Sequence, residues 1–294
     1  MTNLLMFGLG FSAEHYLALD AARWTAIVAT VRDPARAAEL SAGAPAGRTV
    51  LPFDGRSLST DVAAAVDRAD ALLISAPPGE AGDPVLACCG DALMKAGRVR
   101  DVVYLSTLGV YGNYDGAWID EDSECRAQDG RTRRRYDAEQ AWLDFGARSG
   151  ATVTILRLAG IYGPGRSAID NVQAGTARII DKPGQVFNRI HVADIAQAIE
   201  ASFARRVGGV FNVCDDEPTP PGDPIVYAAS LLGLAPPPVI PFEIARQSMS
   251  PMAISFYADC RRVRNDRLKT VLGVSLRYPT YREGLNALSP PRSS

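Results

Sequence analysis

A glycine-rich turn between two apolar segments near the amino terminus most strongly constrains the fold. Residues 3–7 (NLLMF) form a short apolar run that fits a strand buried on both faces. The run leads into the pattern G-x-G-x-x-A at residues 8–13, an alanine-rich helical segment follows at residues 13–22, and residues 24–30 predict the next strand. Strand, glycine turn, helix and strand within about thirty residues are typical of a dinucleotide-binding βαβ unit.

Each residue of such a turn has a mechanical role. Gly8 permits the tight turn, Gly10 lets the backbone approach a pyrophosphate, and Ala13 allows the helix to pack closely on the strand. Phe11 and Ser12 begin the helix, whose exposed N–H groups and dipole favour an anion. We therefore expect Gly8, Gly10, Phe11 and Ser12 to bind the cofactor.

Arg32 stands at the end of the second predicted strand, about 20 residues beyond the glycines, where dinucleotide-binding proteins read the adenosine ribose. An acidic residue there would accept a hydrogen bond from the 2′-hydroxyl, whereas an arginine suits a 2′-phosphate. Asp33 has a local role, because aspartate followed by Pro34 is a good start for a helix. The sequence therefore predicts NADP as the cofactor, with NAD less favoured. The alternative for Arg32 is a solvated loop side chain.

Strands and helices alternate beyond this unit as far as residue 158. Apolar runs fit buried strands at residues 48–53, 71–75, 102–106 and 151–158, and the segments between them fit helices at residues 35–40, 60–69, 83–96 and 132–149. This alternation predicts an α/β fold with a doubly wound parallel Rossmann sheet.

Glycine and proline become frequent after residue 160, which predicts a second, looser lobe. We expect a Rossmann domain over residues 1–165, with residues 188–214 returning to it as a helix and a strand. A smaller C-terminal lobe over residues 166–294 would bind the substrate.

Composition and charge restrict the partners. A net charge of −2 over 294 residues gives no footprint for nucleic acid, and no segment reaches the roughly twenty apolar residues of a membrane span. Five cysteines without metal-type spacing favour free thiols in a reducing cytosol. The two histidines, His15 and His191, give a metal site little support. We expect a cytoplasmic monomer or homodimer with a small-molecule substrate, no metal, no nucleic-acid partner and no membrane partner.

Four ordered segments carry a family resemblance: residues 106–112 (STLGVYG), 156–165 (LRLAGIYGPG), 189–196 (RIHVADIA) and 209–213 (GVFNV). In this order they resemble the extended or atypical short-chain dehydrogenase/reductases, the NAD(P)-dependent epimerase/dehydratase family. The resemblance covers about residues 1–215. It implies a Rossmann fold, an NAD(P) cofactor, and an oxidoreductase or epimerase that acts on a small hydroxyl or carbonyl compound.

The resemblance also implies roles for individual residues. Asp54 would contact the adenine amino group, although it fits a simple turn before a glycine equally well. Ser75, Ala76 and Pro77 match the backbone shelf that borders the cofactor ribose. Thr107, at the end of a predicted strand, matches the hydroxyl that polarises the substrate carbonyl or alcohol.

The Y-x-x-x-K pair of the family is missing. In the family its tyrosine transfers a proton and its lysine lowers the pKa of that tyrosine, which is about 10 when free. An alignment on Glu139 puts Arg131 at the tyrosine and Arg135 at the lysine. An alignment on Tyr136 puts Gln140 at the lysine, so neither alignment restores the pair.

If catalysis survives, Tyr111 with Arg135 is a possible substitute, and Tyr136 is the second candidate for the proton donor. Arginine can hold ribose hydroxyls and stabilise an oxyanion, but it cannot titrate. Dehydratases of the family carry an acid pair where this chain has Leu108 and Gly109, which disfavours the dehydration of a nucleotide sugar.

Two functions remain open from the sequence. Thr107, Tyr111 and the long polar segment 107–131 favour an NADP(H)-dependent oxidoreductase or epimerase. The missing Y-x-x-x-K pair favours a non-catalytic NADP(H)-binding sensor or regulator of the same fold.

Overall fold

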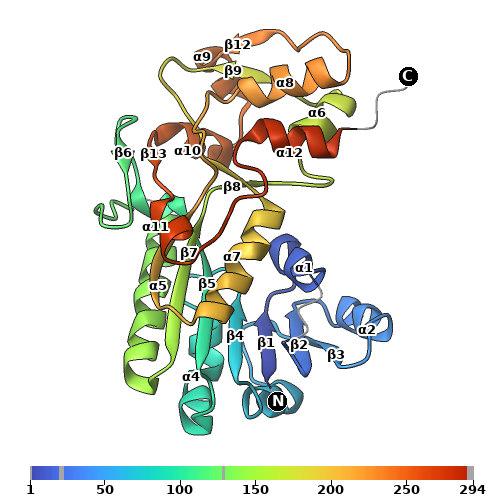
Figure 1. The fold of residues 1–294 in the computed structure, drawn as a ribbon, viewed down its shortest axis with the longest axis vertical. Helices are drawn as coiled ribbons and strands as arrows, with labels where there is room; N and C mark the ends of the chain where they lie inside the picture. Colours follow the sequence, from blue (N-terminus) through green and yellow to red (C-terminus); the bar gives the residue numbers. More distant parts are fainter. Residues whose placement is uncertain (1, 20–22, 128–129, 290–294) are drawn as a thin grey trace.

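Seven parallel strands form the central sheet of the computed structural model, which describes residues 2–19, 23–127 and 130–289 (Figure 1). The strands are β1 (Asn3–Phe7), β2 (Ala26–Val31), β3 (Arg48–Pro52), β4 (Ala71–Ile74), β5 (Asp101–Thr107), β7 (Thr152–Leu158) and β11 (Gly209–Val213). They lie in the order β11-β7-β5-β4-β1-β2-β3, and every neighbouring pair is parallel. The strand order reverses between β1 and β4, the kind of position where open α/β sheets form their ligand crevice. The predicted Rossmann fold class is confirmed.

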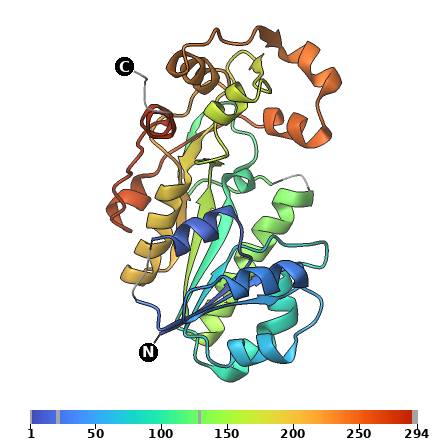
Figure 2. The same ribbon diagram turned by 90° about the vertical axis from the view of Figure 1, so that its right-hand side faces the viewer.

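Helices cover both faces of the sheet (Figure 2). One face carries α1 (Phe11–Leu17), α2 (Pro34–Ala42), α7 (Val192–Arg205) and α11 (Asp266–Thr270), and the other carries α3 (Thr60–Val66), α4 (Pro84–Ala96) and α5 (Gly130–Ser149). In β1, Leu4 and Met6 pack into the core of the first face, whereas Leu5 and Phe7 pack into the core of the second. Successive side chains of a strand point to opposite faces, so both must be apolar.

The helix starts follow capping residues that are visible in the sequence. Asp33 accepts a hydrogen bond from the backbone N–H of Ala35 at 3.0 Å, and Pro34 is the first residue of α2. Asp83 caps α4 in the same way, again before a proline. Helix α1 ends at Leu17, earlier than predicted, and residues 20–22 lie outside the described part of the chain.

The second lobe lies above the carboxyl ends of the strands in Figure 1. Its first stretch contains β8 (Gly160–Tyr162), α6 (Ala168–Gln173), β9 (Ile179–Asp181) and β10 (Arg189–His191). After the return of α7 and β11 to the sheet, the lobe continues with α8 (Asp223–Leu231), β12 (Val239–Pro241), α9 (Phe242–Ala245), the 3₁₀ turn η2 (Arg246–Ser248), α10 (Pro251–Ala258) and finally α12 (Tyr281–Leu288). The short parallel pairs β8–β10 and β9–β12 hold it together.

The chain between α10 and α12 goes back to the sheet side. Strand β13 (Arg262–Val263) pairs with β6 (Trp118–Ile119), which belongs to the long segment after β5. Leu268 and Leu272 belong to the same core cluster as Leu4 and Met6. The predicted lobe over residues 166–294 therefore includes a stretch that packs with the sheet.

A buried carboxylate ties the last part of the chain to α7. Asp194 accepts hydrogen bonds from the backbone N–H groups of Arg277 at 2.7 Å and Tyr278 at 3.1 Å. Burial raises the pKa of Asp194, and these two hydrogen bonds oppose that rise. The aspartate of the 189–196 segment thus fastens the chain that leads into α12.

Candidate functional site

The glycine turn lies at the carboxyl end of β1, against the end of β4. Gly8 has a φ of +95°, and a Cβ at this position would lie 2.9 Å from the backbone nitrogen of Ala76. Of the twenty amino acids, glycine alone tolerates this backbone conformation together with so close an approach at low cost. A Cβ at Gly10, in contrast, would meet nothing within 4 Å. The turn is therefore packed tightly against the end of β4 at Gly8, whereas the space beside Gly10 is open.

The start of α1 is shaped by one aromatic side chain. Ser12 and Ala13 are buried, whereas Phe11 is half-buried and packs against His15 with ring centroids 4.6 Å apart. The guanidinium carbon of Arg166 lies 5.7 Å from the Phe11 ring centroid. Sequence reasoning missed Arg166. The only signal was its place directly after the Y-G-P-G stretch of the family.

Three arginines and one aspartate follow the carboxyl ends of β2 and β3, the neighbouring strands at which the adenosine ribose is predicted to lie. Arg32 follows β2 directly and is exposed, and no ion-pair partner for it is found in the described part of the chain. Arg36, in the first turn of α2, lies 3.7 Å from the Glu14 carboxylate. Asp54 accepts a hydrogen bond from the backbone N–H of Arg56 at 2.9 Å, which is a turn-stabilising contact. Sequence reasoning missed Arg36 and Arg56.

The predicted shelf beside the cofactor ribose follows β4. The backbone N–H groups of Ser75 and Ala76 both donate to the carbonyl oxygen of Phe7, at 2.8 and 2.9 Å. Pro77 is exposed beyond them. These bonds join the ends of β1 and β4, so the shelf and the glycine turn are held as one rigid edge.

Thr107 is the last residue of β5 and is half-buried. Its Oγ1 accepts a hydrogen bond from the backbone N–H of Gly109 at 3.1 Å. A Cβ at Gly109 would lie 3.1 Å from Cγ2 of Thr132 and 3.4 Å from Oγ1 of Thr107. The first turn of α5 is thus packed closely against the end of β5.

Arg135 binds the same strand one helical turn later. Its Nη1 donates to the carbonyl oxygen of Leu105 at 2.8 Å and lies 3.4 Å from the hydroxyl of Tyr104. The guanidinium is therefore fixed beside the strand that ends at Thr107. Arg135 and Thr107 are brought to the same edge of the sheet, as the residue-by-residue resemblance implies.

Tyr111 is placed differently from the prediction. Its side chain is fully buried, and its hydroxyl donates to Oδ1 of Asn212 at 2.8 Å. Burial raises the pKa of Tyr111, although the Arg157 guanidinium 4.7 Å from its ring centroid opposes that rise. The Tyr111 hydroxyl is therefore engaged in the core rather than exposed at the end of β5, and its role as a proton donor stays a prediction.

Tyr136 is half-buried on α5 and packs against the core cluster that contains Tyr111. Its ring centroid is 5.8 Å from the guanidinium carbon of Arg133. Its role as a proton donor stays a prediction.

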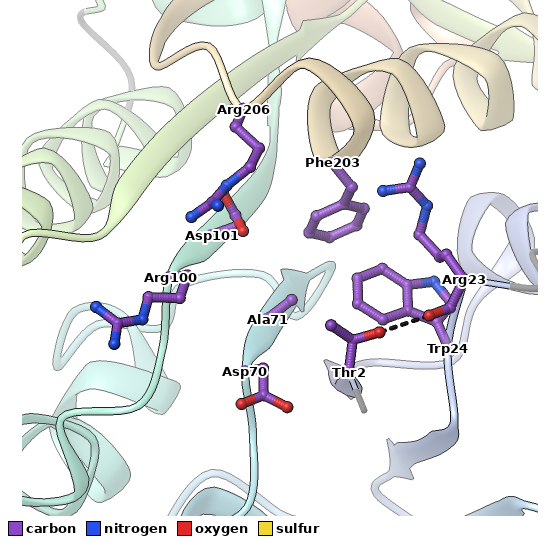
Figure 3. Close-up of a pocket in the computed structure, with 9 residues that line it drawn as sticks. All are labelled: Thr2, Arg23, Trp24, Asp70, Ala71, Arg100, Asp101, Phe203 and Arg206. Atoms are coloured by element: carbon purple, nitrogen blue, oxygen red, sulfur yellow. Dashed lines mark hydrogen bonds and ion pairs between the residues drawn. The ribbon is translucent and has the colours of Figure 1, made fainter.

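A hollow lies at the opposite edge of the sheet. It has a volume of about 270 Å³ and lies at the amino ends of β1, β4 and β5 (Figure 3). Its lining consists of Thr2, Arg23, Trp24, Asp70, Ala71, Arg100, Asp101, Phe203 and Arg206. Ligands of open α/β sheets bind outside the carboxyl ends of the strands, so this hollow is separate from the candidate site.

Within residues 2–19, 23–127 and 130–289, no group of three or more histidine, cysteine, aspartate or glutamate side chains could hold a metal ion. No helix in these ranges is both long and apolar enough to cross a bilayer.

The chain is similar to known proteins in sequence and fold. A family model described as NAD(P)H-binding matches residues 10–205. The structure of a functionally unknown conserved protein from Silicibacter pomeroyi is 46% identical, with a TM-score of 0.86 over 98% of both chains. The dTDP-glucose 4,6-dehydratase of Bacillus anthracis, solved in complex with NAD, is 15% identical, with a TM-score of 0.76 over 98% of this chain and 95% of that one. This last likeness concerns the fold alone.

A curated relative adds a named reaction. The 3-diazoavenalumate denitrifying reductase of a Streptomyces species is 31% identical over 137 residues, which are 45% of this chain and 45% of that protein. The chain therefore matches less than half the length of this relative.

Proposed function

Because the chain belongs to the NAD(P)H-binding family and has the fold of the NAD-dependent epimerases and dehydratases, we propose that it is an NADP(H)-dependent reductase of a small molecule. The observation that carries the proposal is the rigid edge formed by the glycine turn, the Ser75–Pro77 shelf, Thr107 and Arg135. These groups come from β1, β4, β5 and α5 and meet at the carboxyl ends of the strands.

The choice of NADP rests on the arginines at the adenosine end. Arg32 has no ion-pair partner in the described part of the chain, Arg36 lies in the first turn of α2, and Arg56 lies in the turn after β3. A 2′-phosphate carries about two negative charges, which suits guanidinium groups in a way that a 2′-hydroxyl does not. The dehydratase neighbour is solved with NAD, so the preference of this chain needs its own measurement.

That measurement is a titration followed by nicotinamide fluorescence. Arg32→Ala should weaken NADPH binding by about 1.5–3 kcal/mol, the scale of hydrogen bonds to charged groups, and leave NADH binding unchanged. Arg148→Ala, an exposed arginine in the last turn of α5, is the matched control. Equal affinities for the two cofactors in the wild type would rule out the NADP preference.

At the reacting end the chain offers hydrogen-bond donors. The nicotinamide, when bound, supplies the hydride. Oγ1 of Thr107 accepts from Gly109, so its own proton is free to be donated to a substrate oxygen. Arg135 uses Nη1 on the β5 backbone, which leaves its other N–H groups for ribose hydroxyls or a developing negative charge.

A reductase without the family tyrosine needs a reaction that does not depend on it. The Streptomyces relative is named as a reductase that denitrifies a diazo compound. When hydride replaces dinitrogen on a diazonium carbon, the new C–H bond forms as the C–N bond breaks, the bonding pair leaves with neutral N₂, and no alkoxide is left to protonate. Diazo compounds and other strong electrophiles therefore belong in the substrate screen beside ordinary carbonyl compounds.

The decisive experiment follows deuterium. NADPH labelled at C4, separately on each face, is incubated with the protein and a panel of carbonyl, enone and diazo compounds, and the products are analysed by mass spectrometry. We expect label transfer from one face only, lowered by about 100-fold or more in Thr107→Ala, the scale expected for loss of a donor to developing charge. Tight NADPH binding without any label transfer would overturn the reductase proposal in favour of the NADP(H)-binding sensor.

A further inference from the structure

Helix α10 of the second lobe exposes two apolar side chains on one side. Met252 is 60% exposed and Phe256 is 54% exposed. Their spacing of four residues puts them on the same face of the helix. Exposed apolar side chains that adjoin one another, unlike single scattered ones, mark a surface that binds a ligand or a partner.

Phe256 also contacts a residue of the Rossmann domain. The guanidinium carbon of Arg131, in the first turn of α5, lies 5.3 Å from the centroid of the Phe256 ring. Figure 1 shows α10 in the upper lobe, on the side where α5 begins. The pair therefore bridges the Rossmann side and the second lobe.

The contacts of α5 locate this bridge relative to the candidate site. Thr132, the next residue, packs beside Gly109 and Thr107. Arg135, one turn later, binds the carbonyl oxygen of Leu105 in β5. Arg131 therefore emerges from α5 at the level where β5 ends, which is where a substrate would meet the nicotinamide.

Within the described residues the charge of Arg131 has no ion-pair partner. In the described part of the chain its one interaction is with the Phe256 ring, whereas Arg133 on the same helix pairs with Asp137 at 2.9 Å. Among the described residues, the start of α5 thus brings a guanidinium without an ion-pair partner to the end of β5, and such a group favours an anion.

We propose that Arg131 and Phe256 form a substrate clamp that selects a carboxylate carried on a flat apolar body. A guanidinium above an aromatic ring keeps its in-plane N–H groups free, and two of these match the two oxygens of a carboxylate. The exposed faces of Phe256 and Met252 cover the apolar body. The clamp deepens the proposed reductase function and rests on it for the place of the nicotinamide.

The test measures binding rather than turnover. The probe is 2-naphthoate, titrated calorimetrically into the protein saturated with NADP⁺, beside the neutral 2-naphthamide and the dianionic 2-naphthyl phosphate. We expect 2-naphthoate to bind at least about tenfold more tightly than the amide, the factor that corresponds to a charge-assisted hydrogen bond. A tighter fit of 2-naphthyl phosphate would overturn the carboxylate and indicate a phosphate ester as substrate.

The variants assign the effect to the clamp. Arg131→Gln should weaken 2-naphthoate binding about tenfold or more and leave 2-naphthamide unchanged, whereas Phe256→Ala should weaken both. Arg133→Gln is the matched control, because Arg133 is paired with Asp137. NADPH affinity should stay the same in all three variants. No binding of 2-naphthoate at millimolar concentration, or binding that Arg131→Gln leaves unaffected, would overturn the clamp.

The clamp and the reductase can fail separately. Naphthoate binding that depends on Arg131, without label transfer to any compound, would keep the clamp and refute the reductase. Label transfer to neutral compounds that is unaffected by Arg131→Gln would keep the reductase and refute the clamp.

Discussion

The carboxylate of Glu139 and the guanidinium of Arg157 form an ion pair that is closed off from solvent. Nη2 of Arg157 lies 2.7 Å from Oε2 of Glu139, and Nε lies 3.2 Å from both carboxylate oxygens. The Glu139 side chain is 0% exposed and that of Arg157 is 4% exposed. The Ser106 hydroxyl also donates to Glu139. One carboxylate therefore joins α5 to β5 and β7, beside the candidate site.

Removal of this carboxylate should be costly. Glu139→Ala leaves the Arg157 charge buried and unpaired, and breaking such a pair typically costs about 3–5 kcal/mol. Urea unfolding followed by circular dichroism measures the change. Asp137→Ala is the control, because its pair with Arg133 is exposed and should contribute about 1 kcal/mol or less. Similar losses in both variants would contradict the importance of the buried pair.

Tyr111→Phe should alter stability and spare turnover. The change removes the hydroxyl that Oδ1 of Asn212 accepts from, and an unsatisfied buried acceptor costs about 1–3 kcal/mol. Once a substrate is known, steady-state rates and urea unfolding are compared for the two proteins. A rate lower by a factor of about 100 with unchanged stability, the mark of a lost general acid, would return Tyr111 to the site.

The two glycines of the turn should respond in opposite ways. Gly10 has φ −113° and ψ −173°, which valine adopts readily, so Gly10→Val should unfold at the wild-type temperature but no longer bind dinucleotide. Gly8→Ala combines a left-handed backbone with a close approach to Ala76, and should cost at least about 1–3 kcal/mol. Thermal unfolding and NADPH titration distinguish them. Dinucleotide binding at full strength by Gly10→Val would show that the pyrophosphate lies elsewhere.

The lowered pKa of His191 should make the protein lose stability as the pH falls from 6.5 towards 4. Its Nδ1 accepts from the backbone N–H of Ala193, and its ring is packed between Tyr162 and Tyr278. Burial, with smaller effects of His15 and Arg277, lowers the pKa of His191 from 6.5 to about 4. The unfolded chain therefore binds a proton that the folded chain excludes, and stability present above pH 6.5 is lost as the pH falls towards 4.

His191→Asn isolates this effect. Asparagine can cap α7 as the histidine does, but it does not titrate. The difference in unfolding free energy between wild type and variant should change by about 2–3 kcal/mol between neutral pH and pH 4, from the size of the shift. A difference that does not vary with pH would mean that His191 is protonated equally in both states.

The sheet could be predicted because its strands and the helix starts between them are marked by residues that are neighbours in the sequence. Strands covered on both faces must be apolar at every position, so residues 71–75 and 102–106 stood out as continuous runs. Aspartate before proline marked the starts of α2 and α4. Distant packing had no such signature. The short strands of the second lobe pair across long separations, and nothing in residues 179–181 indicates a partner at residues 239–241.

The candidate site was predictable where the backbone decides and unpredictable where side-chain direction decides. Gly8 and Gly10 follow from the turn alone. Tyr111 ends a 3₁₀ turn that begins at Leu108, and this turn directs the Tyr111 ring into the core. Arg166 reaches Phe11 from a segment far along the chain. A sequence gives the separation of two residues along the chain but not the direction in which each side chain points.

The hydrogen bonds from Arg277 and Tyr278 to Asp194 bear on how such proteins diversify. The second lobe is drawn from stretches interleaved with α7, β11 and β13, and Asp194 fastens the last of them to the sheet side. The second lobe therefore cannot be exchanged between homologues as a single unit, because excision would leave the buried Asp194 carboxylate without its two backbone donors. New specificities on this scaffold must arise through point substitutions and loop-length changes, with the framework inherited whole.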